Sequence, residues 1–187
     1  FGRAASARAK PYVDWHAGWS KVRSRPLRVG FVSGDLKLHP TGHFLESILG
    51  HIDRTRIELV AYPTRRFEDA LTARIKPYFS AWTPLASLND EQAAARIRDD
   101  RIDLLPDLSG HMNYNRLPLF AWRPAPVQAS WLGYFASTGL PAMDYLLGDP
   151  HVLPDDAQAH YTERLWRLPD SYLCFTPPAE RVDVGPL

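Results

Sequence analysis

The sequence predicts an α/β domain built on a Rossmann-like, doubly wound and mostly parallel sheet. Apolar runs of strand length alternate with segments of helical periodicity along most of the chain. The 187 residues, 45% of them hydrophobic and 12% aromatic, suffice for one layered domain with a full core. Small polar residues and histidines follow several of the expected strands, where such sheets keep their ligands.

The first strand and helix are the clearest elements. Residues 27–33 form an apolar run that ends in small residues, as expected of a buried strand. The next segment carries apolar residues at the spacing of a helix face packed on a sheet. These residues are Phe44, Leu45, Ile48, Leu49 and Ile52.

The alternation continues through the middle of the chain. Residues 57–62 are the second expected strand, and 67–79 the next helix. A short strand at 80–83 leads to Asn89, whose side chain is of the type that caps helix N-termini. We therefore expect a helix from there to Asp100.

The second half repeats the pattern with shorter elements. A strand at 102–108 ends in a Ser-Gly-His loop, and a helix at 115–122 stops before an Arg-Pro pair. Further strands are expected at 127–132 and 143–147. Pro106 conflicts with a central strand because proline removes a ladder donor, so it marks either a bulge or the strand's end.

Composition excludes several classes of partner. The formal charge is +1, from 22 basic and 21 acidic residues without a long run of one sign, so no electrostatic footprint for nucleic acid or an anionic membrane exists. No apolar stretch is long enough for a signal sequence or a membrane span. The single cysteine, Cys174, cannot form an internal disulfide, and we expect it as a buried thiol. A cytoplasmic protein is expected.

Both ends of the sequence look cut. Phe1 is not an initiator methionine, and residues 1–10 have the composition of the tail of an Ala- and Arg-rich helix. Residues 177–187 contain proline and show no periodicity. We expect a domain of a longer chain.

The loops that follow parallel strands converge on one edge of the sheet. Here they are 34–41, 109–115 and 133–141, and a helix starting near Thr41 would aim free backbone N–H groups at an anion. No G-x-G-x-x-G and no Walker lysine is present, so the chain holds half a site rather than a complete nucleotide site. The polar side chains on these loops are Asp35, His39, His43, His111, Tyr134, Ser137 and Thr138.

Each candidate also has a structural interpretation. His39 is either a functional group or a loop histidine with a structural hydrogen bond. Asp35 follows a glycine, as turn and capping residues do, and His43 has the place of a capping or packing residue. A metal site built from these three is disfavoured, because Pro40 and Gly42 interrupt the continuous helix that i and i+4 histidines need.

Five motifs stand in order between residues 27 and 177. They are Leu27-Arg-Val-Gly-Phe-Val-Ser-Gly-Asp35, His39-Pro-Thr-Gly-His43, Asp107-Leu-Ser-Gly-His111, Leu119-Phe-Ala-Trp-Arg-Pro-Ala-Pro-Val-Gln-Ala-Ser-Trp-Leu-Gly-Tyr134 and Met143-Asp-Tyr145. Their order and spacing resemble the catalytic region of the O-GlcNAc transferases, glycosyltransferase family 41, and most closely its bacterial homologues.

The resemblance implies an inverting transfer of GlcNAc from UDP-GlcNAc to Ser or Thr hydroxyls of a protein acceptor, without a metal ion or other cofactor. It implies a GT-B enzyme with two Rossmann-like lobes, of which residues 27–177 are the amino-terminal one. Residues 1–26 would be a helical tail and linker from upstream tetratricopeptide repeats, and 178–187 a linker to the carboxyl-terminal lobe. That lobe holds most UDP contacts in the family, including a lysine on the diphosphate, so we expect this chain alone to be inactive.

The resemblance also implies roles for single residues. His39 would lie against the donor and Asp35 would take the acceptor proton through water, which makes these two the catalytic candidates. Thr41 would lie near the sugar, and His111 stands where the animal enzymes carry tyrosine, which puts its acceptor contact in question. The substrate-binding candidates are Pro40, Thr41, His43, Gly110, His111, Leu132, Gly133 and Tyr134.

The protonation role of His39 stays open at this point. A neutral imidazole would act as a base or a hydrogen-bonding bridge, and an imidazolium would act as a counter-charge for the pyrophosphate. We favour donor positioning for His39.

Other functions also stay open. A protein O-fucosyltransferase or an N-glucosyltransferase shares this framework, because donor choice depends on the other lobe. A non-catalytic acceptor-binding module and a generic nucleotide-binding Rossmann enzyme are the alternatives outside this reaction.

Overall fold

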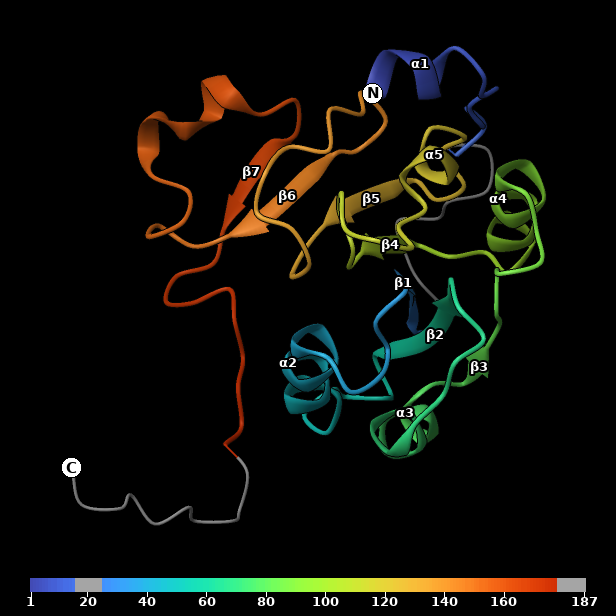
Figure 1. The fold of residues 1–187 in the computed structure, drawn as a ribbon, viewed down its shortest axis with the longest axis vertical. Coiled ribbons are helices and arrows are strands. Elements are labelled where there is room, and N and C mark those ends of the chain that lie inside the picture. Colours follow the sequence, from blue (N-terminus) through green and yellow to red (C-terminus); the bar gives the residue numbers. More distant parts are fainter. Residues whose placement is uncertain (16–24, 178–187) are drawn as a thin grey trace.

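The computed structural model describes residues 1–15 and 25–177, which form a seven-stranded sheet with helices on both faces (Figure 1). All strand pairs are parallel, and the strand order is β3-β2-β1-β4-β5-β6-β7. The strands are β1 (Leu27–Ser33), β2 (Ile57–Pro63), β3 (Ala81–Trp82), β4 (Leu104–Asp107), β5 (Val127–Ser130), β6 (Tyr145–Gly148) and β7 (Arg164–Arg167).

Helices cover the sheet in two groups. Figure 1 shows α2 and α3 together on one side of the line of strands and α4 and α5 on the other. Two 3₁₀ turns, η1 and η2, complete the set. The bounds are α1 (Gly2–Ser6), α2 (Pro40–Leu49), α3 (Ala70–Ile75), η1 (Lys76–Tyr78), α4 (Asp90–Asp99), α5 (Leu117–Phe120) and η2 (Asp155–His160).

The two core layers follow from the period of two along each strand. Phe31 in β1 packs in the layer that contains Leu45 of α2, whereas its neighbour Val32 packs in the opposite layer with Ile97 of α4. Because both faces are buried, the central strands are apolar almost without a break, which is the pattern that predicted a parallel sheet. The predicted doubly wound fold is confirmed.

The strand order places the polar loops. The chain leaves β1 toward β2 and β3 on one side, and then returns to place β4 on the other side of β1. In a doubly wound sheet this reversal opens a crevice beyond the carboxyl ends of the two central strands. The loops after Ser33 and Asp107 therefore meet.

Several boundaries differ from the prediction. The helix expected at 67–79 is regular only over Ala70–Ile75, because Pro77 turns its end into η1. The strand expected from residue 102 begins at Leu104, and Pro106 lies inside it, aligned with Ala129 of β5 and one residue before the strand ends.

The sheet also gains an edge strand that the sequence does not reveal. β7 is four residues long with exposed and half-buried positions in alternation, and Trp166 in it is 54% exposed. A short, charged segment without an apolar run has no strand signal of its own. Its pairing with β6, from Tyr145 with Arg164 to Gly148 with Arg167, makes it a strand.

The segments outside the sheet are partly described. Helix α1 is shorter than the predicted helical tail, and the residues after it pack on the sheet layer, with the Tyr12 N–H donating to the Trp122 carbonyl at 2.9 Å. Residues 178–187 lie outside the described residues, so the predicted domain boundaries stay predictions. Cys174 is exposed, so the expected buried thiol was wrong, because the segment after β7 runs along the surface. Within the described ranges no helix has the length and apolarity needed to cross a membrane.

One glycine controls how the loop after β1 seats on α2. A Cβ at Gly42 would overlap the Lys37 carbonyl oxygen and approach the Asp35 carbonyl oxygen to 3.2 Å. We therefore expect Gly42→Ala to lower the free energy of unfolding by about 1–3 kcal/mol, as overpacking does. Urea denaturation measures this.

Gly50 is the matched control at the other end of α2. Its backbone is right-handed helical (φ −71°), and a Cβ there would meet only the Tyr78 hydroxyl at 3.6 Å. Gly50→Ala should be neutral or stabilise the protein by about 0.4–1 kcal/mol. Equal loss of stability in both variants would contradict the close packing of the loop on Gly42.

Candidate functional site

His39 is the N-cap of α2. Its backbone is extended (φ −160°, ψ 151°), and its ring Nδ1 accepts a hydrogen bond from the Thr41 N–H at 3.2 Å. Pro40 at the first helical position needs no acceptor and has a φ suited to a helix start. The imidazole therefore performs the task that Ser, Asp or Asn usually performs.

This cap determines which ring nitrogen is available. Because Nδ1 accepts from a backbone N–H, a neutral His39 carries its proton on Nε2. Nε2 has no partner among the described residues and can donate to a ligand. The predicted row of free N–H groups at the helix start is largely absent, since Pro40 has none and that of Thr41 is used by the ring.

Asp35 lies directly beside this cap. The residue is 7% exposed, and its Oδ2 is 4.0 Å from Nδ1 of His39. Within the described ranges no N–H or O–H donates to its carboxylate, while its own N–H donates to Ser33 Oγ at 3.0 Å. The capping role that the sequence offered to Asp35 is filled by His39. The carboxylate is left as an unoccupied acceptor.

A buried carboxylate organises the neighbouring loop after β4. Asp107 is fully buried and accepts from the Ser109 N–H at 3.2 Å and the Gly110 N–H at 2.7 Å. Ser109 Oγ in turn accepts from the Gly34 N–H at 3.4 Å, which ties the two central loops together. Burial outweighs these hydrogen bonds and raises the pKa of Asp107 to about 6.

The end of β5 approaches this loop through backbone contacts. The Gly133 N–H donates to the Trp131 carbonyl at 2.9 Å across Leu132, whose φ of +74° is strained for a residue with a side chain. A Cβ at Gly133 would overlap the Leu108 carbonyl. Glycine is needed there because two backbones touch.

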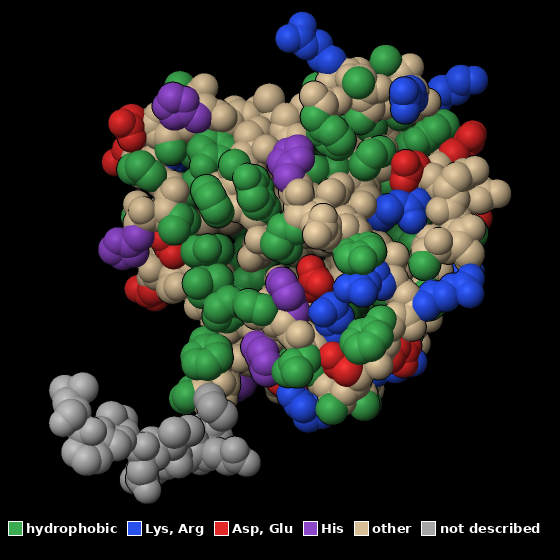
Figure 2. All heavy atoms as spheres, in the orientation of Figure 1, with side chains coloured by type: hydrophobic (Ala, Val, Ile, Leu, Met, Phe, Trp, Pro, Cys, Tyr) green, Lys and Arg blue, Asp and Glu red, His purple; other side chains and the backbone are tan. Residues whose placement is uncertain are grey.

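The loops after β1 and β4, with one residue that follows β2, line a hollow of about 510 Å³. On the face shown in Figure 2, histidine, basic and acidic side chains lie close together near the start of α2. An arginine that follows β2 adds a positive charge to the wall. The residues that line the hollow are Asp35, His39, Arg65, His111, Met112, Asn113 and Tyr114.

The structure brings some predicted site residues together and separates others. Asp35, His39 and His111 share the hollow. The rings of His111 and Tyr134 pack edge to face, with their centroids 5.8 Å apart. His43 lies at a different hollow on the outer side of α2, next to Glu46. The remaining candidates do not line the hollow: Pro40 and Thr41 begin α2, and Gly110, Leu132 and Gly133 lie in the turns that follow β4 and β5.

Two residues of the site were not singled out from the sequence. Asp107 stands in the sequence as part of a motif, and a carboxylate at the end of an apolar strand is the signal that marks it. Arg65 carried no signal, because its distance from His39 along the chain hides a proximity that only the pairing of β1 with β2 creates.

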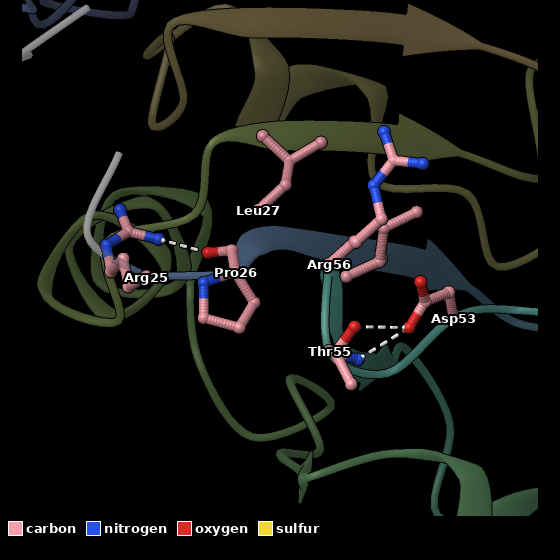
Figure 3. Close-up of a pocket in the computed structure, with 7 residues that line it drawn as sticks. Arg25, Pro26, Leu27, Asp53, Thr55 and Arg56 are labelled. Atoms are coloured by element: carbon pink, nitrogen blue, oxygen red, sulfur yellow. Dashed lines mark hydrogen bonds between the residues drawn. The ribbon is translucent and has the colours of Figure 1, made fainter. Parts of the chain in front are cut away.

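A larger hollow, about 760 Å³, lies at the other end of the strands, where β1 and β2 begin. Its polar groups bind one another, as Figure 3 shows: Arg25 donates to the Pro26 carbonyl at 3.1 Å and Thr55 Oγ1 to Asp53 at 2.6 Å. Arg25 also pairs with Asp103 at 2.7 Å. These groups are engaged in structural bonds, whereas the Asp35 carboxylate and Nε2 of His39 have no hydrogen-bond partner among the described residues.

Among the described residues, no group of three or more His, Cys, Asp or Glu side chains is placed to hold a metal ion.

The fold and this hollow define a doubly wound α/β protein with its polar site at the topological switch point. The family model of glycosyl transferase family 41 matches residues 7–176. The chain belongs to this family, and the resemblance seen in its motifs is confirmed.

Curated relatives of plants and animals carry similar sequences. Proteins of Solanum lycopersicum and Arabidopsis thaliana, each named a probable UDP-N-acetylglucosamine–peptide N-acetylglucosaminyltransferase SPINDLY, are 37% and 36% identical to it. The alignments cover 94% and 91% of this chain and 19% of each relative. A UDP-N-acetylglucosamine–peptide N-acetylglucosaminyltransferase of Caenorhabditis elegans is 34% identical over 82% of this chain and 14% of its own length.

A solved O-GlcNAc transferase of Thermobaculum terrenum has the same fold. It superposes with a TM-score of 0.81 at 45% identity, over 83% of this chain and 30% of that one. The predicted GT-B lobe is thereby confirmed as the fold class. The chain spans about a fifth of the curated relatives it matches.

The buried carboxylate at the site makes stability depend on pH. Because the pKa of Asp107 rises from 3.8 to about 6 on folding, the folded state holds this proton more tightly than the unfolded state. The contribution is therefore fully present below about pH 4 and is lost as the pH rises to about 6, by roughly 2–3 kcal/mol. The difference in unfolding free energy between wild type and Asp107→Asn should fall over this range and stay flat above it.

Urea denaturation at a series of pH values measures this difference. Asp107→Asn also loses one of two acceptors for backbone N–H groups, which lowers stability at every pH. A difference that is constant from pH 4 to pH 7 would contradict the raised pKa.

Proposed function

We propose that the full-length protein transfers GlcNAc from UDP-GlcNAc to Ser or Thr hydroxyls of a protein acceptor, with inversion at the anomeric carbon. Membership of glycosyl transferase family 41 and the names of the relatives support this donor and this class of acceptor. This chain would supply one wall of the active site. The carboxyl-terminal lobe would supply most contacts to UDP, and amino-terminal tetratricopeptide repeats would contact the acceptor.

The single observation that carries the mechanism is the Asp35 carboxylate. It is 7% exposed and lines the hollow, and no donor in the described part of the chain occupies it. A hydroxyl that attacks an anomeric carbon must lose a proton, and a positioned carboxylate can accept it directly or through one water. Asp35 would take this proton.

His39 would position the donor. Its Nδ1 is held by the Thr41 N–H, so its Nε2–H is presented to the hollow in one orientation. A fixed N–H of this kind can bind an oxygen of the donor sugar and hold the anomeric carbon in place for attack. This geometry supports the positioning role over that of a base at Nδ1.

The protein would act in the cytoplasm, without a metal ion or other cofactor. Pro40, Thr41, Gly110, Leu132 and Gly133 would shape the walls around the sugar through their backbone turns. His111 and Tyr134 would face the acceptor.

Two substitutions at His39 separate capping from catalysis. His39→Ala removes both the N-cap and the ring, so we expect stability to fall by about 1 kcal/mol and kcat/KM to fall by roughly 100-fold or more. His39→Asn keeps a capping side chain, so stability should recover while turnover stays low. Transfer from UDP-GlcNAc to a serine peptide by the full-length protein measures turnover, and thermal melting measures stability.

Asp35→Asn should lower kcat without loss of UDP-GlcNAc affinity, and His43→Ala should retain transfer because its ring lies at another hollow. Wild-type rates in His39→Asn would refute the positioning role. Transfer from GDP-fucose in place of UDP-GlcNAc would refute the proposed donor.

A further inference from the structure

Arg65 carries an unused positive charge in the wall of the hollow. It follows β2, and it is the only Lys or Arg among the described residues that line the hollow with Asp35 and His39. No carboxylate pairs with it and no acceptor takes a hydrogen bond from its guanidinium within residues 1–15 and 25–177. A guanidinium offers five N–H donors in a planar fork, so the wall presents a free site for an anion.

Two aromatic rings hold the guanidinium of Arg65 in place. Its central carbon lies 4.0 Å from the centroid of the Tyr114 ring and 6.0 Å from that of Phe67. The Tyr114 backbone is locked in turn, because its carbonyl accepts from Thr64 Oγ1 at 2.6 Å and its φ is +63°. Stacking leaves the edge of the guanidinium available while it limits the motion of the side chain.

Other arginines of similar burial are fully engaged. Arg116 donates to Asp90 at 2.8 Å and to two backbone carbonyls, and Arg123 donates to Asp144 at 2.9 Å and to two backbone carbonyls. Each of them fastens a loop. Arg65 fastens none: the two aromatic rings hold its guanidinium, and its N–H groups have no acceptor among the described residues.

The place of Arg65 indicates which anion it meets. In an inverting displacement the attacking hydroxyl and the leaving diphosphate lie on opposite sides of the anomeric carbon. The hollow that holds Asp35, the proton acceptor of the proposed reaction, is therefore on the acceptor side. The Asp35 carboxylate would also repel a doubly charged diphosphate placed against the same wall.

We propose that Arg65 binds a carboxylate of the acceptor polypeptide and thereby selects serine and threonine sites with a nearby Asp or Glu. The inference rests on the proposed function, because that function makes this side of the hollow the acceptor side. An Asp or Glu side chain matches the guanidinium fork with two parallel hydrogen bonds. Selection would act on peptide binding and not on the chemical step.

The experiment uses the full-length protein and pairs of serine peptides that differ by Asp against Asn at each flanking position in turn. For the wild type, kcat/KM should be about 10-fold higher with the best Asp peptide than with its Asn partner. The difference should come from a lower KM for the peptide, with kcat unchanged. Arg65→Gln should remove this preference, and Arg65→Lys should keep part of it, since a point charge lacks the fork. The neighbouring exposed Arg66, changed in Arg66→Gln, is the matched control and should behave as the wild type.

Binding of fluorescently labelled peptides to the UDP-loaded full-length protein gives a second readout. If no sugar is transferred from UDP-GlcNAc, the proposed function fails. The affinities of the Asp and Asn peptides, measured by fluorescence anisotropy, still show whether Arg65 binds the peptide carboxylate. An acid preference that persists in Arg65→Gln overturns the proposal. So does a raised KM for UDP-GlcNAc with peptide discrimination intact, which would place the guanidinium on the leaving diphosphate.

Discussion

β1 and β4 are neighbours at the centre of the sheet although α2, β2, α3, β3 and α4 separate them in the chain. The meeting of the two central site loops depends on this pairing. It brings the loop after Ser33 against the loop after Asp107, and the Ser109 hydroxyl then accepts from the Gly34 N–H. Without the parallel alignment the histidines and carboxylates would lie on separate loops with no common hollow.

Two carboxylates at this edge have opposite tasks, and their surroundings show why. Asp107 is fully buried under backbone N–H donors and holds the loop from inside, with its pKa raised by burial. Asp35 faces the hollow with no donor of its own. A buried, hydrogen-bonded carboxylate stabilises a turn, whereas an unoccupied one at a wall is available for a proton or a ligand.

The fold and the chemistry share residues at the start of α2. The His39 ring caps the helix through Nδ1 and leaves Nε2 available at the hollow, so one side chain ends the loop and, in the proposed function, would also orient the donor. Gly42 lets the loop seat directly on the helix, and Gly133 lets the end of β5 reach Leu108. Precise placement of the site therefore comes from backbone contacts that tolerate no added carbon, rather than from side-chain packing alone.

The sequence by itself determined the α/β class, the central strands and which loops carry the candidate site residues. These follow from periodicity, caps and motifs, which are local features of the chain. It predicted β1 and the Asn89 cap as the structure has them. Only the tertiary structure decided that β7 is a strand, that His39 and not Asp35 caps α2, and that Arg65 joins the hollow. Each of these depends on partners far away in the chain or on which of two nearby side chains makes the capping hydrogen bond, and neither is encoded in a local pattern.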